Sequence, residues 1–113
     1  MKSYYTISEV ADIVGVKPHV LRYWEATLKV PSPKRRAGKR FYSQKDVKMA
    51  FLIKILLYKH GYTLEKVSRM LKEERAEKLY GLLVEPIVKD VKKELETVLD
   101  EISEIISKLE AAS

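Results

Sequence analysis

The sequence predicts a mainly α-helical protein in which short helices and a basic two-stranded hairpin precede a long C-terminal helix. Three observations predict this fold class. Capping and turn residues divide the first part of the chain into short helices, basic residues around a glycine mark the hairpin, and an unbroken heptad pattern marks the last helix. The 113 residues suffice for one small domain and an appendage.

The first two helices are predicted from a capping box and a glycine-containing turn. Thr6 and Glu9 have the spacing at which each side chain can bond the other's backbone N–H, and Gly15 ends the helix that they begin. Pro18 suits the first position of a second helix, expected to run to about Thr27. Two such helices form a helix-turn-helix. Their inner faces are expected to hold Ile7, Val10, Ala11 and Val14, then Val20, Leu21, Trp24 and Leu28.

The next segment changes character. Pro31 and Pro33 exclude a helix, and residues 34–42 are predicted to form a tight hairpin, or wing, with Gly38 supplying a positive φ at its tip. A second capping box at residues 43–46 begins a helix that ends near Gly61. Thr63 caps a fourth helix. The residues available for the core of this pair are Val47, Ala50, Phe51, Ile53, Leu56, Leu57, Leu64, Val67, Met70 and Leu71.

A heptad seam runs along the C-terminal quarter. From Pro86 the helix would span about 24 residues, or roughly 36 Å. The unbroken pattern favours pairing with a second copy over folding back on the chain's own head, but it leaves the orientation of the pair open. The expected boundaries are a domain at 1–75, a connector at 76–85 and a dimerisation helix at 86–111. The seam residues are Val84, Val88, Val91, Leu95, Val98, Ile102, Ile105 and Leu109.

Charge divides the chain in the same place. The formal net charge is +6, but residues 85–113 hold four lysines against eight acidic residues, so residues 1–84 carry +10. A basic head of this kind favours an anionic partner, and double-stranded DNA fits a helix-turn-helix.

Two basic surfaces are candidate DNA contacts. The outer face of the second helix can donate to base edges or phosphates in a major groove, and the wing can clamp phosphates or enter a minor groove. The alternatives are an ordinary solvated helix face and a solubilising loop. A further cation, Lys59, could touch phosphate where the third helix turns into the fourth. The candidate residues are Lys17, His19, Arg22, Tyr23, Lys34, Arg35, Arg36, Lys39, Arg40, Tyr42 and Lys59.

Several function classes are not favoured. The chain has no cysteine, its two histidines lack metal-ligand spacing, and no phosphate loop or catalytic set is recognisable. We therefore expect no enzyme activity, cofactor or metal. No apolar run reaches the roughly 18 residues of a membrane span, and the first ten residues do not resemble a signal peptide. We expect a cytoplasmic, nucleoid-associated protein.

Residues 4–72 resemble MerR-type transcriptional regulators. The matching motifs are Tyr5–Ala11, Gly15-Val16, Leu21–Glu25, Arg40–Val47, Gly61–Val67 and Met70-Leu71, in the order and spacing of that family. The resemblance implies a homodimer joined by an antiparallel coiled coil, bound to a near-palindromic operator. It also implies that promoter DNA is distorted so that RNA polymerase can engage it.

The same resemblance assigns residue roles. By carry-over, Lys17, Arg22 and Tyr23 would be contacts of the recognition helix, and Arg36, Arg40 and Tyr42 contacts of the wing. His19 falls at a variable position of the family and is expected to contribute to sequence preference. The chain lacks the cysteines of the family's metal and redox sensors and the large effector domain of its drug sensors, so the resemblance supports DNA binding and dimerisation better than ligand sensing.

Two other functions stay open at this point. An architectural protein for chromosome organisation could carry the same kind of head on a coiled-coil tail, and would bind many weakly related sites. A pure protein-interaction module would leave the +10 head without a purpose. The short tail favours the regulator.

Overall fold

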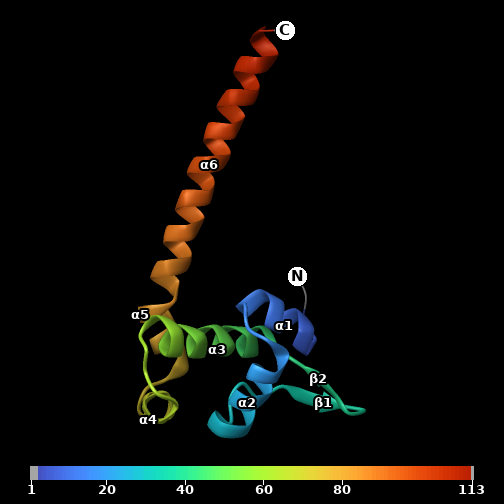
Figure 1. Ribbon diagram of the computed structural model, residues 1–113, viewed down its shortest axis with the longest axis vertical. Coiled ribbons are helices and arrows are strands. Elements are labelled where there is room, and N and C mark those ends of the chain that lie inside the picture. Colours follow the sequence, from blue (N-terminus) through green and yellow to red (C-terminus); the bar gives the residue numbers. More distant parts are fainter. Residues whose placement is uncertain (1–2, 113) are drawn as a thin grey trace.

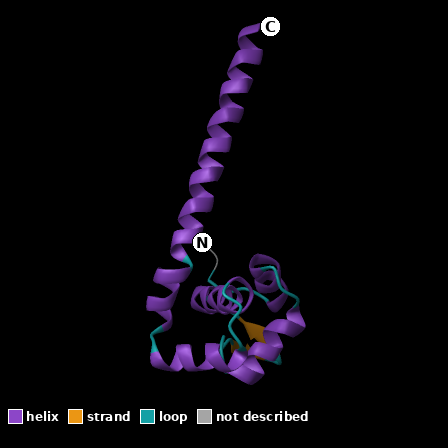
Figure 2. Cartoon of the chain, turned by 60° about the vertical axis from the view of Figure 1, so that its left-hand side comes forward, coloured by secondary structure: helices purple, strands orange, loops and turns teal. Residues whose placement is uncertain are grey.

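The computed structural model describes residues 3–112 as a helical head from which one long helix projects (Figure 1). Its extents are 60 × 34 × 21 Å. Helix dominates, and the strands of the described residues are confined to one small hairpin (Figure 2). The elements are α1 (Ile7–Val14), α2 (Pro18–Leu28), β1 (Lys34–Arg36), β2 (Lys39–Phe41), α3 (Gln44–Lys54), the π-helical turn η1 (Ile55–Lys59), α4 (Leu64–Glu73), α5 (Ala76–Leu83) and α6 (Glu85–Ala112). We call residues 3–84 the head and α6 the tail.

Local signals begin α1 and α2, and end α1, as predicted. The Thr6 hydroxyl accepts from the Glu9 N–H at 3.2 Å, and the Glu9 carboxylate accepts from the Thr6 N–H at 3.0 Å. Gly15 ends α1 at φ 78°. The Lys54 ammonium of α3 donates to the carbonyl oxygen of Val14 at 2.7 Å, where the negative end of the α1 dipole attracts a cation. This contact ties α1 to α3.

The wing is the predicted antiparallel hairpin. Lys34 pairs with Phe41 and Arg36 with Lys39, and Gly38 takes a positive φ of 78° in the turn. A β-bridge between Tyr5 and Tyr42 joins the start of the chain to the base of the hairpin, with backbone hydrogen bonds of 2.8 and 2.9 Å. The wing is therefore anchored at its base, and its tip stays exposed.

Two adjoining apolar clusters form the core of the head. The first joins α1 and α2 to Tyr42 and to the inner face of α3, and the second joins α3, η1, α4 and α5. Leu52, which the sequence reasoning did not include, is buried in the second cluster, whereas Phe51 is only partly buried. The helix that begins at Gln44 passes into the π-helical turn at Ile55, which shifts the faces of the residues that follow.

The structure shows a helix within the predicted connector and corrects one seam residue. Residues 76–83 form a helix, α5, which packs against α3 and leads directly into α6. Val84 follows it, is 2% exposed, and belongs to the second core cluster with Leu79. Val84 is therefore a core residue of the head rather than part of an exposed seam, because it packs with the buried residues of α3, η1, α4 and α5.

The tail leaves its apolar face uncovered. The 28-residue α6 contains no buried residue, and its length is about 42 Å at 1.5 Å per residue. Seven predicted seam residues are between 37% and 66% exposed: Val88, Val91, Leu95, Val98, Ile102, Ile105 and Leu109. Within residues 3–112, none of the helices has both the length and the apolar character that crossing a membrane requires.

Candidate DNA interface

The outer face of α2 presents polar side chains to solvent. Its first residue, Pro18, follows Lys17, whose extended backbone lets α2 begin without a side-chain cap. Leu21 and Trp24 point into the core, so the predicted contact residues at the intervening positions face outward. Tyr23 is 53% exposed. The structure thus brings together on one exposed surface Lys17, His19, Arg22 and Tyr23.

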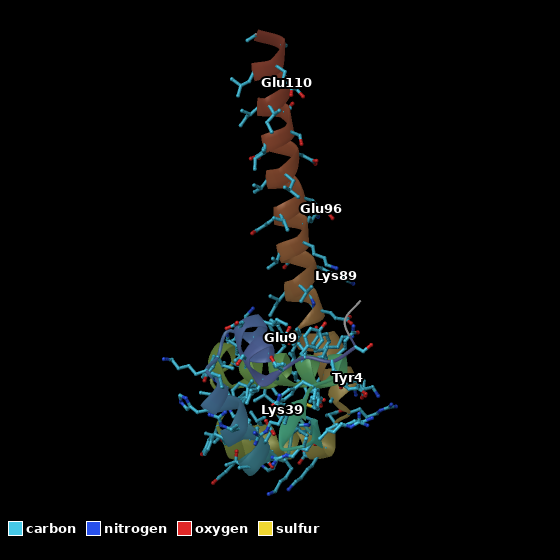
Figure 3. The ribbon with its side chains drawn as sticks, turned by 90° about the vertical axis from the view of Figure 1, so that its right-hand side faces the viewer. Tyr4, Glu9, Lys39, Lys89, Glu96 and Glu110 are labelled. Carbon is cyan, nitrogen blue, oxygen red and sulfur yellow. The ribbon has the colours of Figure 1, made fainter. Side chains whose placement is uncertain are left out.

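The wing adds a second exposed basic surface. It lies with α2 on the side of the head away from α6 (Figure 1). Arg35, Arg36 and Lys39 are exposed, while the Lys34 ammonium lies 6.0 Å from the centre of the Tyr4 ring. Nitrogen-tipped side chains project from the head at many points, whereas oxygen-tipped side chains recur along α6 (Figure 3). The predicted division into a basic head and an acidic tail is visible in the fold.

A carboxylate joins these two surfaces. Glu25 of α2 accepts from the Arg40 Nε at 3.1 Å through one oxygen and from the Tyr42 hydroxyl at 2.6 Å through the other. The Arg40 side chain is 24% exposed and that of Glu25 is 10% exposed. Arg40 is therefore turned toward α2 more than toward solvent.

Tyr42 departs from its predicted role. It was expected as a wing contact to DNA, but it is 0% exposed and lies in the first core cluster. Burial, with a smaller contribution from the hydrogen bond to Glu25 and its negative charge, raises the pKa of Tyr42 well above its usual value. The phenol therefore stays protonated and donates to Glu25, and it is not available to a phosphate.

Sequence reasoning missed Glu25, although a signal was present. A carboxylate on a helix expected to face DNA repels phosphate unless a cation neutralises it. Arg40 and Tyr42 stand two apart in and next to a strand, so their side chains share one side. Which side meets α2 depends on tertiary packing, and alternation alone cannot supply that information.

Lys59 lies apart from the wing, at the end of η1, and is exposed. Beyond it, the rings of His60 and Tyr62 stack with centroids 5.6 Å apart, and the Lys66 ammonium lies 6.0 Å from the Tyr62 ring. Tyr58 is 60% exposed. The turn between η1 and α4 is thus a separate basic and aromatic surface, and the described contacts do not connect it to the wing.

Other chemistry is sparse in the part of the chain that the structure describes. No group of three or more metal-ligating side chains occurs among residues 3–112. A half-open cavity of about 400 Å³ lies between the segment that leads into the wing, α3 and α5, with Val30, Met49 and Tyr80 among its lining residues. Burial and the charge of Glu85 raise the pKa of Tyr80. The Lys48 ammonium lies 5.6 Å from the centre of the Tyr80 ring, at the side of this cavity.

Comparison with known proteins identifies the family. The profile described as "MerR HTH family regulatory protein" matches residues 5–74, which include the helix-turn-helix, the wing, and α3 to α4. The chain belongs to the MerR family. The family that the sequence motifs indicated is thereby confirmed, and it is a family of regulatory proteins rather than of enzymes.

Individual MerR relatives are similar at moderate identity. The chain is 33% identical over 89 residues to the "Uncharacterized HTH-type transcriptional regulator YyaN" of Bacillus subtilis (strain 168), covering 78% of this chain and 59% of that protein. It is 35% identical over 68 residues to the "Mercuric resistance operon regulatory protein" of Bacillus cereus, covering 59% of this chain and 51% of that protein. The chain therefore spans between half and three fifths of the length of these relatives.

Two solved structures share the fold. One is HiNmlR, described as a MerR family regulator lacking the sensor domain and bound to promoter DNA. Its TM-score is 0.51 at 22% identity, covering 95% of this chain and 79% of that one. The other is a MerR family transcriptional regulator from Bacillus cereus, with a TM-score of 0.52 at 23% identity, covering 93% and 81%. The predicted fold class, with its small wing and long last helix, is confirmed.

Proposed function

We propose that this MerR-family chain is a sequence-specific DNA-binding regulator of transcription that acts as a homodimer. The observation that carries the proposal is the exposed polar face of α2 beside the exposed cations of the wing. An α-helix fits the major groove, and the cations of a neighbouring hairpin suit the flanking phosphates. The proposed contacts are Lys17, His19, Arg22, Tyr23, Arg35, Arg36, Lys39, Arg40 and Lys59.

Base reading and phosphate binding are assigned to different elements. On α2, Arg22 can donate two parallel hydrogen bonds to a guanine edge, and the neighbouring His19 can add to the preference. In the wing, Arg36 and Lys39 can bind phosphates whatever the sequence. Membership of the MerR family, and the binding of the similar protein HiNmlR to promoter DNA, support a role of the head in DNA binding.

The dimer is proposed from the uncovered seam of α6. Apolar side chains repeated at heptad spacing on an exposed helix are stabilised by a second helix of the same kind. The apolar stripe is wider in the C-terminal half, where Leu99 and Ile106 are 54% and 49% exposed. Leu82 of α5 is 63% exposed.

These features favour the antiparallel orientation. In an antiparallel pair, the C-terminal half of one α6 lies beside the first turns of the other and near its α5. The stripe with Leu99 and Ile106 on one chain would then lie near the exposed Leu82 of the other chain. In a parallel pair, Leu82 and this stripe would lie at opposite ends of the coiled coil. The proposed seam is the set of seven exposed residues named above, without Val84.

The proposal extends to the promoter. A two-fold dimer requires a near-palindromic operator, and distortion of that DNA would let RNA polymerase engage it. A protein of this kind works at the chromosome, so we place it with the nucleoid in the cytoplasm.

The test is selection of genomic fragments by the purified chain at about 150 mM salt, held constant because phosphate contacts make affinity salt-dependent. Footprinting of the selected fragments should reveal one palindrome within a promoter. Scattered fragments without a shared motif, retained only at low salt, would contradict a regulator and favour an architectural protein.

Two variants separate the roles of α2 and the wing. Arg22→Ala should weaken the selected operator by roughly 10-fold to 100-fold and random DNA much less, because a base contact is lost. Arg36→Ala should weaken both to a similar extent, because a phosphate contact is lost. Equal losses on both DNAs for Arg22→Ala would contradict base reading by α2.

A further inference from the structure

The bridge from Glu25 to the wing adds a polar link between two elements whose apolar side chains already meet in the first core cluster, which holds Leu21, Trp24 and Tyr42. Glu25 lies in the last part of α2, and its two carboxylate oxygens accept separately from the Arg40 Nε at 3.1 Å and the Tyr42 hydroxyl at 2.6 Å. The donors lie fifteen and seventeen residues further along the chain, Arg40 in the middle of β2 and Tyr42 at the base of the hairpin. One side chain therefore holds two points of the wing.

The contact is well suited to fix a position rather than only to add stability. Hydrogen bonds in which one partner is charged are shorter and stronger than neutral ones. The Tyr42 phenol is fully buried, and the Glu25 side chain is nine-tenths buried, so water competes little with either donor. In the hairpin register Arg40 lies opposite Arg35, next to the Arg36–Lys39 pair, so holding Arg40 limits the movement of the exposed tip.

The wing needs such an anchor. Its two strands have three residues each, and an isolated two-stranded hairpin is marginally stable in water. A wing free to move would have to be ordered when DNA binds, and that ordering lowers affinity. The hairpin is also tied to the start of the chain, by the bridge from Tyr5 to Tyr42 and by the Lys34–Tyr4 contact, and Tyr42 packs with α2 in the first core cluster. The Glu25 bridge adds to these a charged contact between α2 and Arg40.

We propose that Glu25 is a positioning residue that sets the distance between the recognition helix α2 and the wing, so that wing cations meet phosphates while α2 occupies the groove. The inference rests on the proposed function and adds a residue to it that does not itself touch DNA. Arg40 has two roles, since its Nε is held by Glu25 while its terminal N–H groups can donate to a phosphate. Arg40 also neutralises the one acidic side chain of α2.

The test compares the full chain with Glu25→Gln, which keeps the shape of the side chain and removes its charge. Two quantities are measured: amide hydrogen exchange of the wing in the free protein, and the salt dependence of binding to the selected operator. Exchange in residues 34–41 should become at least about tenfold faster while α1 and α3 stay protected. The salt slope should become shallower by about 2 for the dimer, since each lost phosphate contact contributes about 0.9.

Matched variants isolate the effect. Glu96→Gln removes the same charge from the outer face of α6 (Figure 3) and should change neither quantity. Tyr42→Phe removes one donor and keeps the Arg40–Glu25 pair, so it should give smaller changes in the same direction. Should Glu25→Gln fail to fold, Tyr42→Phe decides the test alone. Arg36→Ala should make the salt dependence of operator binding shallower, while the amide hydrogen exchange of the wing should stay unchanged.

The outcomes separate this inference from the proposed function. A weaker operator complex with an unchanged salt slope and a protected wing would overturn the positioning role of Glu25. If the unaltered chain selects no DNA, the proposed function fails, and the inference as stated fails with it. In that case, faster hydrogen exchange of the wing in Glu25→Gln would still show that Glu25 anchors the wing in the free protein. The exchange measurement therefore distinguishes a failure of the proposed function from a failure of the anchor.

Discussion

In the head, apolar periodicity is satisfied within the chain, whereas in the tail it is not. Among the described residues, every buried apolar side chain lies between Val10 and Val84, and α6 contributes none. Yet the tail repeats valine, leucine and isoleucine as regularly as any helix of the head. The comparison teaches that regular apolar spacing identifies a helix with a partner, and that only the fold tells whether the partner is in the same chain.

The same substitution in the two regions should have the largest and most contrasting effects. Leu21→Ala empties a fully buried position and should lower the free energy of unfolding by about 2–5 kcal/mol at every protein concentration. Leu95→Ala, at an exposed seam position, should act mainly on the concentration dependence of unfolding. Urea titrations followed by Trp24 fluorescence measure both. A loss for Leu95→Ala that is independent of concentration would indicate that the tail packs on its own head.

A charge in the seam should break the dimer and spare the head. Val98→Arg would bury a cation without a partner, at a cost of about 3 kcal/mol or more, which raises the Kd of the dimer by roughly 100-fold or more. Sedimentation equilibrium measures this change. Glu96→Arg, two residues away on the outer face, is the control and should leave the Kd within a fewfold. A dimer that survives Val98→Arg would place the interface elsewhere.

Serine to alanine should have opposite signs in head and tail. The Ser43 hydroxyl accepts from the Asp46 N–H at 3.2 Å and caps α3, so Ser43→Ala should lower the free energy of unfolding by about 1 kcal/mol. Ser103→Ala, on the exposed face of α6, should raise the helicity of the tail slightly, since alanine favours a helix by roughly 0.5 kcal/mol. Circular dichroism during thermal unfolding compares them, and a loss for Ser103→Ala would indicate an unrecognised contact.

A pH dependence confined to the head is also expected. Because the pKa of Tyr42 is raised in the fold, its stabilising contribution is complete below the ordinary tyrosine pKa of about 10 and is lost as pH rises above it. Tyr42→Phe lacks the hydrogen bond to Glu25, and should be less stable near neutral pH by about 1 kcal/mol. The difference between the urea unfolding midpoints of Tyr42→Phe and the unaltered chain should therefore be smaller at about pH 10.5 than at about pH 8. A constant difference would contradict this account.

Most helix boundaries and turns of the head were predictable from local sequence signals. The capping boxes at Thr6 and Ser43, the positive φ at Gly15 and Gly38, and Pro18 at the start of α2 act within a few residues, so the sequence predicts them directly. Residues 76–83 contain no comparable start signal, since Arg75 makes no side-chain cap, and their helix depends on packing against α3.

The differences at Val84 and Tyr42 have a common physical reason. Val84 continues the heptad spacing, but spacing does not record that the start of this stretch packs with α3, η1, α4 and α5 in the head. Tyr42 follows the three arginines and two lysines of the wing, but strand alternation gives two sides without telling which one meets α2. The exposure of the proposed contact residues of α2 was predictable because the inner face, with Leu21 and Trp24, leaves one outer face.

The uncovered seam of α6 also ties operator occupancy to the abundance of the chain. Below the Kd of the proposed dimer, the concentration of dimer rises with the square of the chain concentration, so doubling the chain gives about four times as much dimer. A promoter controlled by such a protein responds more steeply to changes in its synthesis than it would to a monomer. The exposed valines and isoleucines of the tail would thereby set a threshold, in addition to joining two heads.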